Sequence, residues 1–143
     1  YKDHLWFCVR AGGEDWTGRP TFYFEIGSDY YSYGMGFWAP KAALMEAYRK
    51  AVDEHPEVLE KLVKRFNKQA QFTLSGPEYA RKKTAPSPLL AAWYNKKSIN
   101  LQHDAAPDER MFSQELAQDI IEGFRTLMPL YKYFDALCAA EMV

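Results

Sequence analysis

Residues 21–38 read TFYFEIGSDYYSYGMGFW, and this stretch decides the fold. Phe and Tyr crowd both halves, and Gly27-Ser28-Asp29 interrupts them at a single point. β-favouring residues on either side of a short connection that contains Gly are typical of a bulged hairpin. The stretch therefore predicts two antiparallel strands that fold back on each other.

Alternation along these strands predicts one apolar and one polar face. Glycines inside a strand weaken it and often mark the close approach of another backbone or of a ligand. Gly34 and Gly36 fall on the polar face, where they predict a shallow floor. Trp6 and Tyr23 are the aromatic walls expected beside it. The apolar face, which helices are expected to cover, comprises Phe22, Phe24, Ile26, Tyr31, Tyr33, Met35 and Phe37.

The segments around the hairpin predict further strands and several helices. Pro40 and Pro56 suit first helical turns, since their missing N–H costs nothing there. Pro129 interrupts the last helix and is expected to kink or split it. The predicted strands are residues 5–9, 71–74 and 98–103, and the predicted helices are residues 40–55, 57–69, 89–94 and 113–137.

Together these elements predict an α+β fold in a single domain that spans residues 1–143. We expect an antiparallel sheet, a meander of at least three strands plus a later strand, with helices packed mainly on one face. A length of 143 residues suits one domain, and a hydrophobic fraction of 48% is ample for a sizeable core.

Composition argues against several classes of function. The net charge of −1 gives no field that would favour nucleic acid or an anionic membrane. No apolar run approaches the ~20 residues that cross a bilayer. Cys8 and Cys138 lie far apart in apolar segments, which favours free thiols in a reducing cytoplasm over a disulfide. We therefore expect a cytoplasmic protein with no nucleic-acid and no membrane partner.

The polar face carries the first candidate for chemistry. His and Glu side chains are the usual pair for proton transfer, because burial and neighbours can tune their pKa values. His4 and Glu25 supply such a pair, with Arg10 and Tyr23 on the same face. Aromatic walls with a few convergent polar groups are also what small-molecule pockets look like. The alternative is an ordinary polar face that solvent or another segment covers.

A second candidate is a basic edge built from two segments. If the chain after Gly76-Pro77 folds back beside the later strand, its cations would converge on a phosphate or carboxylate. The alternative is an exposed, solubilising run of charge, since exposed ion pairs contribute only ~0–1 kcal/mol each. The basic edge comprises Arg81, Lys82, Lys83, Lys96 and Lys97.

Metal and cofactor chemistry have no signature in the sequence. His4, His55 and His103 fall in no metal-binding spacing. The nucleophile motif Gly-x-Ser-x-Gly is lacking, and Gly34-x-Gly36 lacks the third glycine of a dinucleotide loop. We therefore expect neither a metal nor a cofactor.

Several landmarks, taken in order, resemble a known family. They are Tyr1-Lys2 before a strand, Tyr33-Gly34-Met35-Gly36-Phe37-Trp38 before a helix, Lys96-Lys97-Ser98 opening a strand, and Leu127-Met128-Pro129-Leu130 in the last helix. Over nearly the whole chain this order resembles the bacterial family catalogued as domain of unknown function 2461. Members are longer at the front, so the resemblance implies that this chain is the C-terminal two-thirds of a longer protein. It also implies that Tyr1-Lys2 ends a basic segment, which adds Lys2 to the anion-contacting cations.

The family has no established activity, so the resemblance implies no reaction and no ligand. The residues favour a domain for interaction or for binding a small molecule or anion, with a small anionic ligand at the basic edge. One alternative is a hydrolase-like, small-molecule enzyme that uses His4 and Glu25 as acid and base. Another is a structural module that forms homo-oligomers through apolar surfaces.

Overall fold

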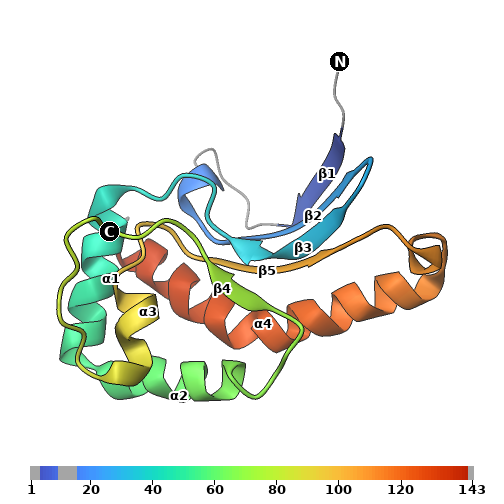
Figure 1. Ribbon diagram of the computed structural model, residues 1–143. Coiled ribbons are helices and arrows are strands. Elements are labelled where there is room, and N and C mark those ends of the chain that lie inside the picture. The colour runs from blue at the N-terminus through green and yellow to red at the C-terminus, as the bar shows by residue number, and fades with distance from the viewer. Residues whose placement is uncertain (1–3, 10–15, 142–143) are drawn as a thin grey trace.

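The fold is seen in a computed structural model, which describes residues 4–9 and 16–141. Its five strands form one antiparallel sheet in the order β1-β2-β3-β5-β4, with helices along one face (Figure 1). The predicted α+β fold, with its meander and its later strand, is confirmed. The strands are β1 (His4–Val9), β2 (Thr21–Gly27), β3 (Tyr31–Gly36), β4 (Thr73–Ser75) and β5 (Asn100–Ala105).

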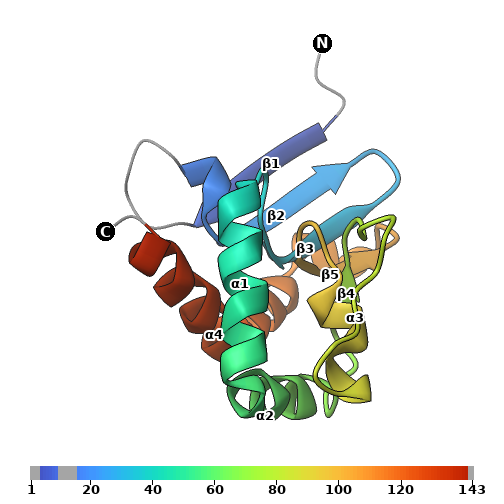
Figure 2. The same ribbon diagram turned by 90° about the vertical axis from the view of Figure 1, so that its left-hand side faces the viewer.

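One long C-terminal helix lies under the sheet, and shorter helices gather at one end of it (Figures 1 and 2). Pro56 begins the second helix, as its missing N–H predicts. Among the described residues, no helix combines the length and the apolar character needed to cross a membrane. The helices are α1 (Ala42–Glu54), α2 (Pro56–Phe66), α3 (Ala91–Tyr94) and α4 (Gln114–Glu141), with short 3-10 turns η1 (Trp16–Gly18), η2 (Pro88–Leu90) and η3 (Glu109–Phe112).

The hairpin forms as the stretch at residues 21–38 predicts. β2 and β3 pair antiparallel along their length, and the Gly27 N–H donates to the Tyr30 carbonyl across the turn (2.9 Å). β1 pairs with the free side of β2, and β5 pairs with the free side of β3. The alternation of this hairpin therefore sets the two faces of the whole sheet.

The apolar face is buried by aromatic contacts with α4. The Phe22 ring lies 4.7 Å from the Phe124 ring, and the Phe37 ring lies 5.6 Å from the Phe134 ring, between centroids. Met35, on the same face of β3, is fully buried. Burial of side chains of this size stabilises the fold by about 1.5–3 kcal/mol each. This burial explains why the helices pack on this face of the sheet.

Helical cover ends before β1. Leu5, Phe7 and Val9 lie on the apolar side of this strand, and each is at least half exposed. Phe7 stacks on Phe24 of β2, with ring centroids 5.3 Å apart. In Figure 1 β1 lies at the edge of the sheet farthest from the helices. The apolar face is thus covered over β3 and β5 and open at β1.

The last helix differs from the sequence prediction at Pro129. The predicted split is wrong, because α4 is one helix with Pro129 inside it. Proline in a helix interior loses a hydrogen bond and costs ~3 kcal/mol. Leu127, Leu130 and Phe134 are buried on both sides of the proline. Their packing holds the helix together across the missing bond.

The second helix ends earlier than expected, at Phe66 rather than at residue 69. The reason is a side-chain turn that follows it. Gln69 Nε2 donates to the Phe72 carbonyl (3.0 Å), and the Phe72 N–H donates to Gln69 Oε1 (2.7 Å). These two hydrogen bonds between Gln69 and Phe72 close a tight turn that leads directly into β4.

Candidate functional site

The face of the sheet away from the helices is polar, and the strand register arranges it in rows. In one row Trp6 lies opposite Glu25, which lies opposite Ser32. Asp104 of β5 continues this row beyond Ser32. Neighbouring strands lie ~4.8 Å apart, so the backbones of the two acidic residues stand ~10 Å apart with Ser32 between them. The next two rows are Cys8, Tyr23, Gly34 and Gln102, and then Thr21, Gly36 and Asn100.

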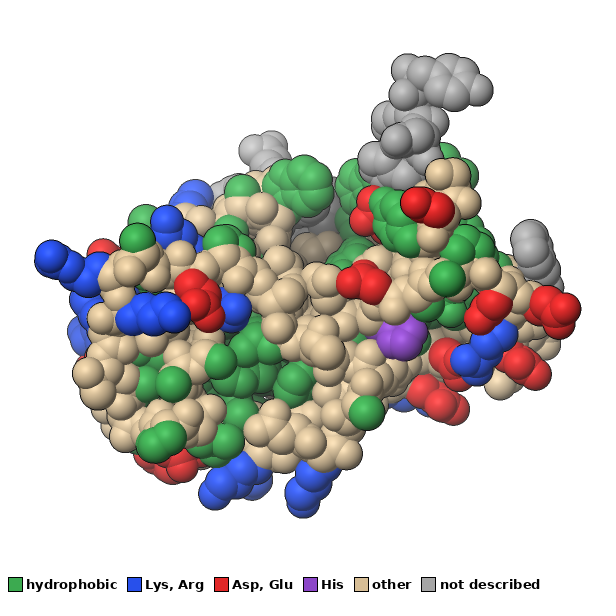
Figure 3. Space-filling view, in the orientation of Figure 1, with side chains coloured by type: hydrophobic (Ala, Val, Ile, Leu, Met, Phe, Trp, Pro, Cys, Tyr) green, Lys and Arg blue, Asp and Glu red, His purple; other side chains and the backbone are tan. Residues whose placement is uncertain are grey.

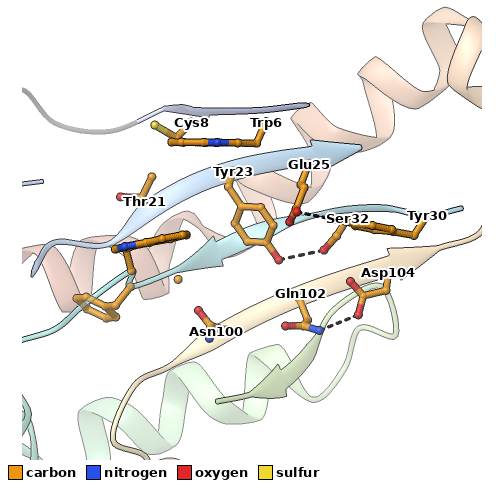
Figure 4. A pocket seen from close by; sticks show the side chains of 13 residues that line it. Trp6, Cys8, Thr21, Tyr23, Glu25, Tyr30, Ser32, Asn100, Gln102 and Asp104 are labelled. Atoms are coloured by element: carbon orange, nitrogen blue, oxygen red, sulfur yellow. Dashed lines mark hydrogen bonds between the residues drawn. The ribbon is translucent and has the colours of Figure 1, made fainter. Parts of the chain in front are cut away.

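These rows form one side of a cavity of about 490 Å³. That volume lies within the ~300–1,000 Å³ typical of small-molecule sites. Figure 3 shows the upper side of the molecule hollowed between hydrophobic side chains, and Figure 4 shows the polar side chains that point into the hollow. We call it the polar-face cavity. It is lined by Trp6, Cys8, Thr21, Tyr23, Glu25, Tyr30, Ser32, Gly36, Phe37, Trp38, Asn100, Gln102 and Asp104.

The two glycines of β3 play different parts. At Gly34 an added methyl group would stand 1.9 Å from the carbonyl oxygen of Leu101, so this glycine admits the neighbouring backbone. At Gly36 the methyl group would stand 2.0 Å from Asn100 Oδ1, a side-chain atom. Gly36 lines the cavity, whereas Gly34 is not among its lining residues. The carboxamide of Asn100 makes no hydrogen bond to another described residue, which leaves it open to the cavity.

A pair of hydroxyl groups occupies the centre of the cavity wall. The Tyr23 hydroxyl lies 3.2 Å from Ser32 Oγ (Figure 4). Burial raises the pKa of Tyr23, the hydrogen bond to Ser32 lowers it, and the charges of Asp104 and Glu25 raise it further. Tyr23 therefore keeps its proton at neutral pH. The negative fields of both carboxylates reach its hydroxyl.

Hydrogen bonds also fix both carboxylates. The Tyr30 hydroxyl donates to Glu25 Oε1 (2.6 Å). On the other side of the cavity, the Ser75 hydroxyl donates to Gln102 Oε1 (2.7 Å). Gln102 Nε2 in turn donates to Asp104 Oδ2 (2.7 Å). These bonds orient acceptor oxygens on β2 and β5 around one space (Figure 4).

Part of the predicted acid–base site cannot be placed. The His4 backbone lies opposite Gly27, next to the row of Glu25. The side chain of His4 and the residues Lys2 and Arg10 lie outside the described part of the chain. The pairing of His4 with Glu25, and the contribution of Lys2, stay predictions. Of the expected aromatic walls, Trp6 and Tyr23 both line the cavity.

The basic edge folds back as its hypothesis requires, but two of its cations share a carboxylate. Glu78 forms an isolated bridge with Lys96. Lys96 is only 8% exposed, and its Nζ donates to the Gly76 carbonyl (3.1 Å) and to Glu78 Oε1 (3.4 Å). Lys82 Nζ lies 3.1 Å from Glu78 Oε2. The pKa of Glu78 is lowered by both lysines, and Lys82 has the larger effect.

The other cations of the basic edge have different surroundings. Lys97 Nζ lies 5.9 Å from the centroid of the Tyr79 ring, and Arg49 Cζ lies 4.4 Å from the same centroid. Arg81 and Lys83 are exposed. The structure thus brings Lys82 and Lys96 together on Glu78, and places Lys97 on a different partner. Anion binding at this edge stays a prediction.

The sequence prediction missed a second hollow of about 280 Å³. Gln71 organises it: its Nε2 donates to the Tyr33 hydroxyl (2.8 Å), and its carbonyl lies 2.7 Å from His103 Nδ1. Among the described residues, no cluster of His, Cys, Asp and Glu could hold a metal ion, here or elsewhere. The hollow is lined by Tyr31, Tyr33, Gln71, His103, Arg110, Asp119 and Glu122.

Comparison with known protein families identifies a match over most of the chain. The model of a family described as "Conserved hypothetical protein (DUF2461)" matches residues 1–133. No curated protein and no solved structure matches the chain. The match confirms the resemblance carried by the sequence landmarks, and it adds no ligand or reaction.

Proposed function

The chain belongs to the family DUF2461, whose function is unknown, and we propose that its polar-face cavity binds a small polar organic molecule. One observation carries this proposal. Hydrogen-bonding side chains of β2, β3 and β5 line a single hollow, and indole rings stand beside them. Apolar walls with a few oriented polar groups are the usual composition of a small-molecule site.

The sheet supports this function by its rigidity. Ser32 is buried and belongs to β3, the central strand, which pairs on both sides. Gln102 is held between Ser75 and Asp104. Groups held in place by a sheet lose little entropy when a ligand binds, which favours affinity. The amide of Asn100, which makes no hydrogen bond to another described residue, supplies both a donor and an acceptor.

A second candidate function keeps the same cavity. Glu25 lines it and is oriented by Tyr30, as a group that transfers protons would be. A hydrolase-like enzyme that uses His4 with Glu25 is therefore the alternative. In that case His4→Ala abolishes an activity found by substrate screening and leaves folding intact; full activity in this variant ends the alternative.

We propose that the protein acts in the cytoplasm. Cys8 and Cys138 are both free thiols, which a reducing compartment preserves. Of the described helices, none could span a membrane. Recovery of the tagged protein after cell fractionation tests the location, and recovery with membranes or the periplasm would contradict it.

A thermal-shift screen of polar metabolites tests the binding proposal. A ligand at ~100 times its dissociation constant stabilises the folded state by ~2.7 kcal/mol, which raises the melting temperature measurably. Trp6→Ala should remove most of the shift, because the indole lines the cavity. Phe7→Ala is the matched control: Phe7 is 50% exposed against 46% for Trp6, and it lies on the opposite face of the same strand.

Two results would contradict the proposal. One is a screen in which no compound stabilises the protein. The other is a set of hits whose shifts survive both Trp6→Ala and Asn100→Leu, since those hits bind elsewhere. A hit lost in both variants and kept in Phe7→Ala supports the polar-face cavity as the binding site.

A further inference from the structure

We propose that the outer edge of β4 binds an extended peptide of a partner protein, through backbone hydrogen bonds and one apolar side chain flanked by acidic residues. β4 is an edge strand: in the described part of the chain, β5 pairs with it and no strand lies on its other side. An unpaired strand edge with a pocket for a side chain is a common means of binding extended peptides. This surface shares no lining residue with the polar-face cavity.

A groove of about 410 Å³ lies beside this edge, between β4, the end of α2 and α3. Its walls are held in place, because the buried rings of Phe66 and Trp93 meet edge to face with centroids 5.3 Å apart. Figure 3 shows hydrophobic side chains between the positions that α2, α3 and β4 occupy in Figure 1. An apolar side chain can therefore enter without first ordering the walls. We call this the β4 groove, and it is lined by Phe66, Asn67, Gln69, Phe72, Thr73, Leu74, Leu89, Ala92 and Trp93.

The backbone beside the groove already binds a group that resembles a peptide bond. The side chain of Gln69 ends in a carboxamide, which has both a donor and an acceptor. Its Nε2 donates to the Phe72 carbonyl (3.0 Å), and the Phe72 N–H donates to its Oε1 (2.7 Å). An adjacent antiparallel strand bonds to both backbone groups of one residue in the same way. The Gln69 carboxamide thus occupies the place of a further strand at Phe72.

The next residue with the same backbone direction is Leu74. Along a strand, alternate residues direct their N–H and C=O groups to the same side. Phe72 directs these groups to Gln69, and pairing with β5 begins at the next residue, Thr73. Leu74 therefore presents its N–H and C=O at the outer edge, beside the groove that it lines. In the described part of the chain, β4 makes no backbone bond to any segment other than β5.

The edge also lacks the usual protection against pairing. Charged side chains and proline commonly block an exposed strand edge. β4 has the sequence Thr73-Leu74-Ser75, which contains neither. A peptide that continues the sheet beside the Gln69 carboxamide thus meets free backbone groups and no blocking side chain.

The end of α2 adds positive charge beside the groove. Lys64 and Arg65 lie in the last turn of this helix, Lys68 follows it, and all are exposed. Lys64 lies one turn before the lining residue Asn67, and residues three apart are neighbours on a helix surface. The described lining residues of the groove include no acidic side chain. This charge favours a peptide with acidic residues on either side of its apolar one.

Titration of the intact chain with defined peptides tests the proposal. The probes are acetylated and amidated pentapeptides EVZVE, in which Z is leucine, isoleucine, phenylalanine or tryptophan. NMR spectra follow the backbone amide signal of Leu74 and the indole signal of Trp93. We expect at least one peptide to give saturable shifts of both signals. Replacement of its glutamates by lysines should weaken binding by roughly tenfold.

Methylation of the peptide backbone tests the pairing itself. Methyl groups on alternate nitrogens remove the N–H groups along one edge of an extended peptide and leave those of the other edge. The bound peptide uses one edge, so one of the two methylation patterns should weaken binding by at least roughly tenfold, and the other should weaken it less.

Two adjacent alanines of α3 give a matched pair of variants. Ala91 and Ala92 are both exposed, and Ala92 lines the groove whereas Ala91 does not. Ala92→Glu places bulk and negative charge in the groove, so it should weaken the peptide by at least roughly tenfold. Ala91→Glu adds the same charge beside it and should leave the affinity near that of the wild type.

Shifts at Leu74 and Trp93 that one methylation pattern and Ala92→Glu remove, and that Ala91→Glu keeps, support the proposal. Three results overturn it: no peptide binds, the saturable shifts lie away from β4 and its groove, or binding survives both methylation patterns. If the same signals move when the chain alone is concentrated, the edge pairs with a second copy and the peptide partner is overturned. None of these outcomes bears on the polar-face cavity, which the metabolite screen tests.

Discussion

At the scale of single residues, the two glycines of β3 separate a structural role from a role in the site. Gly34→Ala should destabilise the protein by about 1–3 kcal/mol, because its methyl group meets the Leu101 backbone, which cannot move aside. Gly36→Ala should cost clearly less, since its methyl group meets the Asn100 side chain, which can rotate. Urea unfolding of both variants measures the difference.

The same two substitutions should also differ in their effect on binding. Gly36→Ala displaces the Asn100 amide and should weaken any ligand of the polar-face cavity, whereas Gly34→Ala should leave affinity near that of the wild type once the protein is folded. Equal destabilisation by the two substitutions would show that β5 does not approach Gly34 as closely as described.

The buried thiol of Cys138 predicts that the free energy of unfolding falls at alkaline pH. Burial raises the pKa of its thiol from 9.0 to about 11. The folded state therefore holds this proton where the unfolded state has lost it, so its contribution is complete below the unfolded pKa and disappears as pH rises toward the folded one. Between about pH 8 and about pH 10 this group should remove about 1 kcal/mol from the free energy of unfolding.

Urea unfolding at both pH values checks this expectation. Cys138→Ala should flatten that part of the pH dependence, even though the substitution lowers stability at every pH by loss of packing. Tyr133, whose pKa burial raises to about 12, titrates higher, and Tyr133→Phe serves as the control. A pH slope in Cys138→Ala that equals the wild-type slope would refute the assignment to the thiol.

At the scale of elements, Lys96 links the loop after β4 to the start of β5. Lys96→Met keeps the apolar stem and removes the bonds to the Gly76 carbonyl and to Glu78. Since it leaves partly buried acceptors without their donor, we expect a loss of about 1–3 kcal/mol in urea unfolding. Lys97→Met, at an adjacent position over the Tyr79 ring, should change stability by less than about 1 kcal/mol.

Equal effects of the two lysine variants would contradict this structural role. The result also bears on the predicted anion site. Because Lys96 supports the fold, charge reversal there would confuse unfolding with lost binding. Arg81 and Lys83, which are exposed, are better positions for that test, and a sulfate-induced rise in melting temperature that survives their reversal would count against the basic edge.

Elements with a local cause could be predicted from the sequence. Phe and Tyr alternate on either side of Gly27, so β2 and β3 follow from residues 21–38 alone. The alternation of Asn100 and Gln102 with apolar neighbours also predicted a strand with a polar side. Two aromatic walls and one glycine of the polar-face cavity were found in this way.

The rest depends on pairing between distant segments. Asp104 reaches the cavity because β5 lies beside β3, a contact made only after α1, α2 and β4 have intervened. Nothing near Lys96 in the sequence indicates that Glu78 becomes its partner. Likewise, packing against the sheet decides that α4 continues through Pro129, where local propensity favours a break.

At the scale of the whole molecule, the two faces of the sheet divide the work. Aromatic side chains on one face of the sheet pack against α4, and the polar-face cavity lies on the opposite face (Figure 1). Charge is separated as well, although the net charge is only −1. Lys96 precedes β5 and Asp104 lies near its end, so positive and negative groups occupy opposite ends of one strand.

The open apolar side of β1 is a separate property of the molecule. Leu5, Phe7 and Val9 form an exposed row there, and exposed apolar rows on edge strands favour association. The expected homo-oligomer stays a prediction, which sedimentation velocity over a range of concentrations decides. A single species at all concentrations would argue against it.

The most direct test of the central claim is to follow the tryptophan indole signals by NMR during titration with a hit from the metabolite screen. Trp6 and Trp38 line the polar-face cavity, whereas Trp93 is buried in the core against Phe66. We expect the signals of Trp6 and Trp38 to shift together and to saturate, while the Trp93 signal stays in place. Saturating shifts confined to Trp93 would contradict a binding site on this face of the sheet.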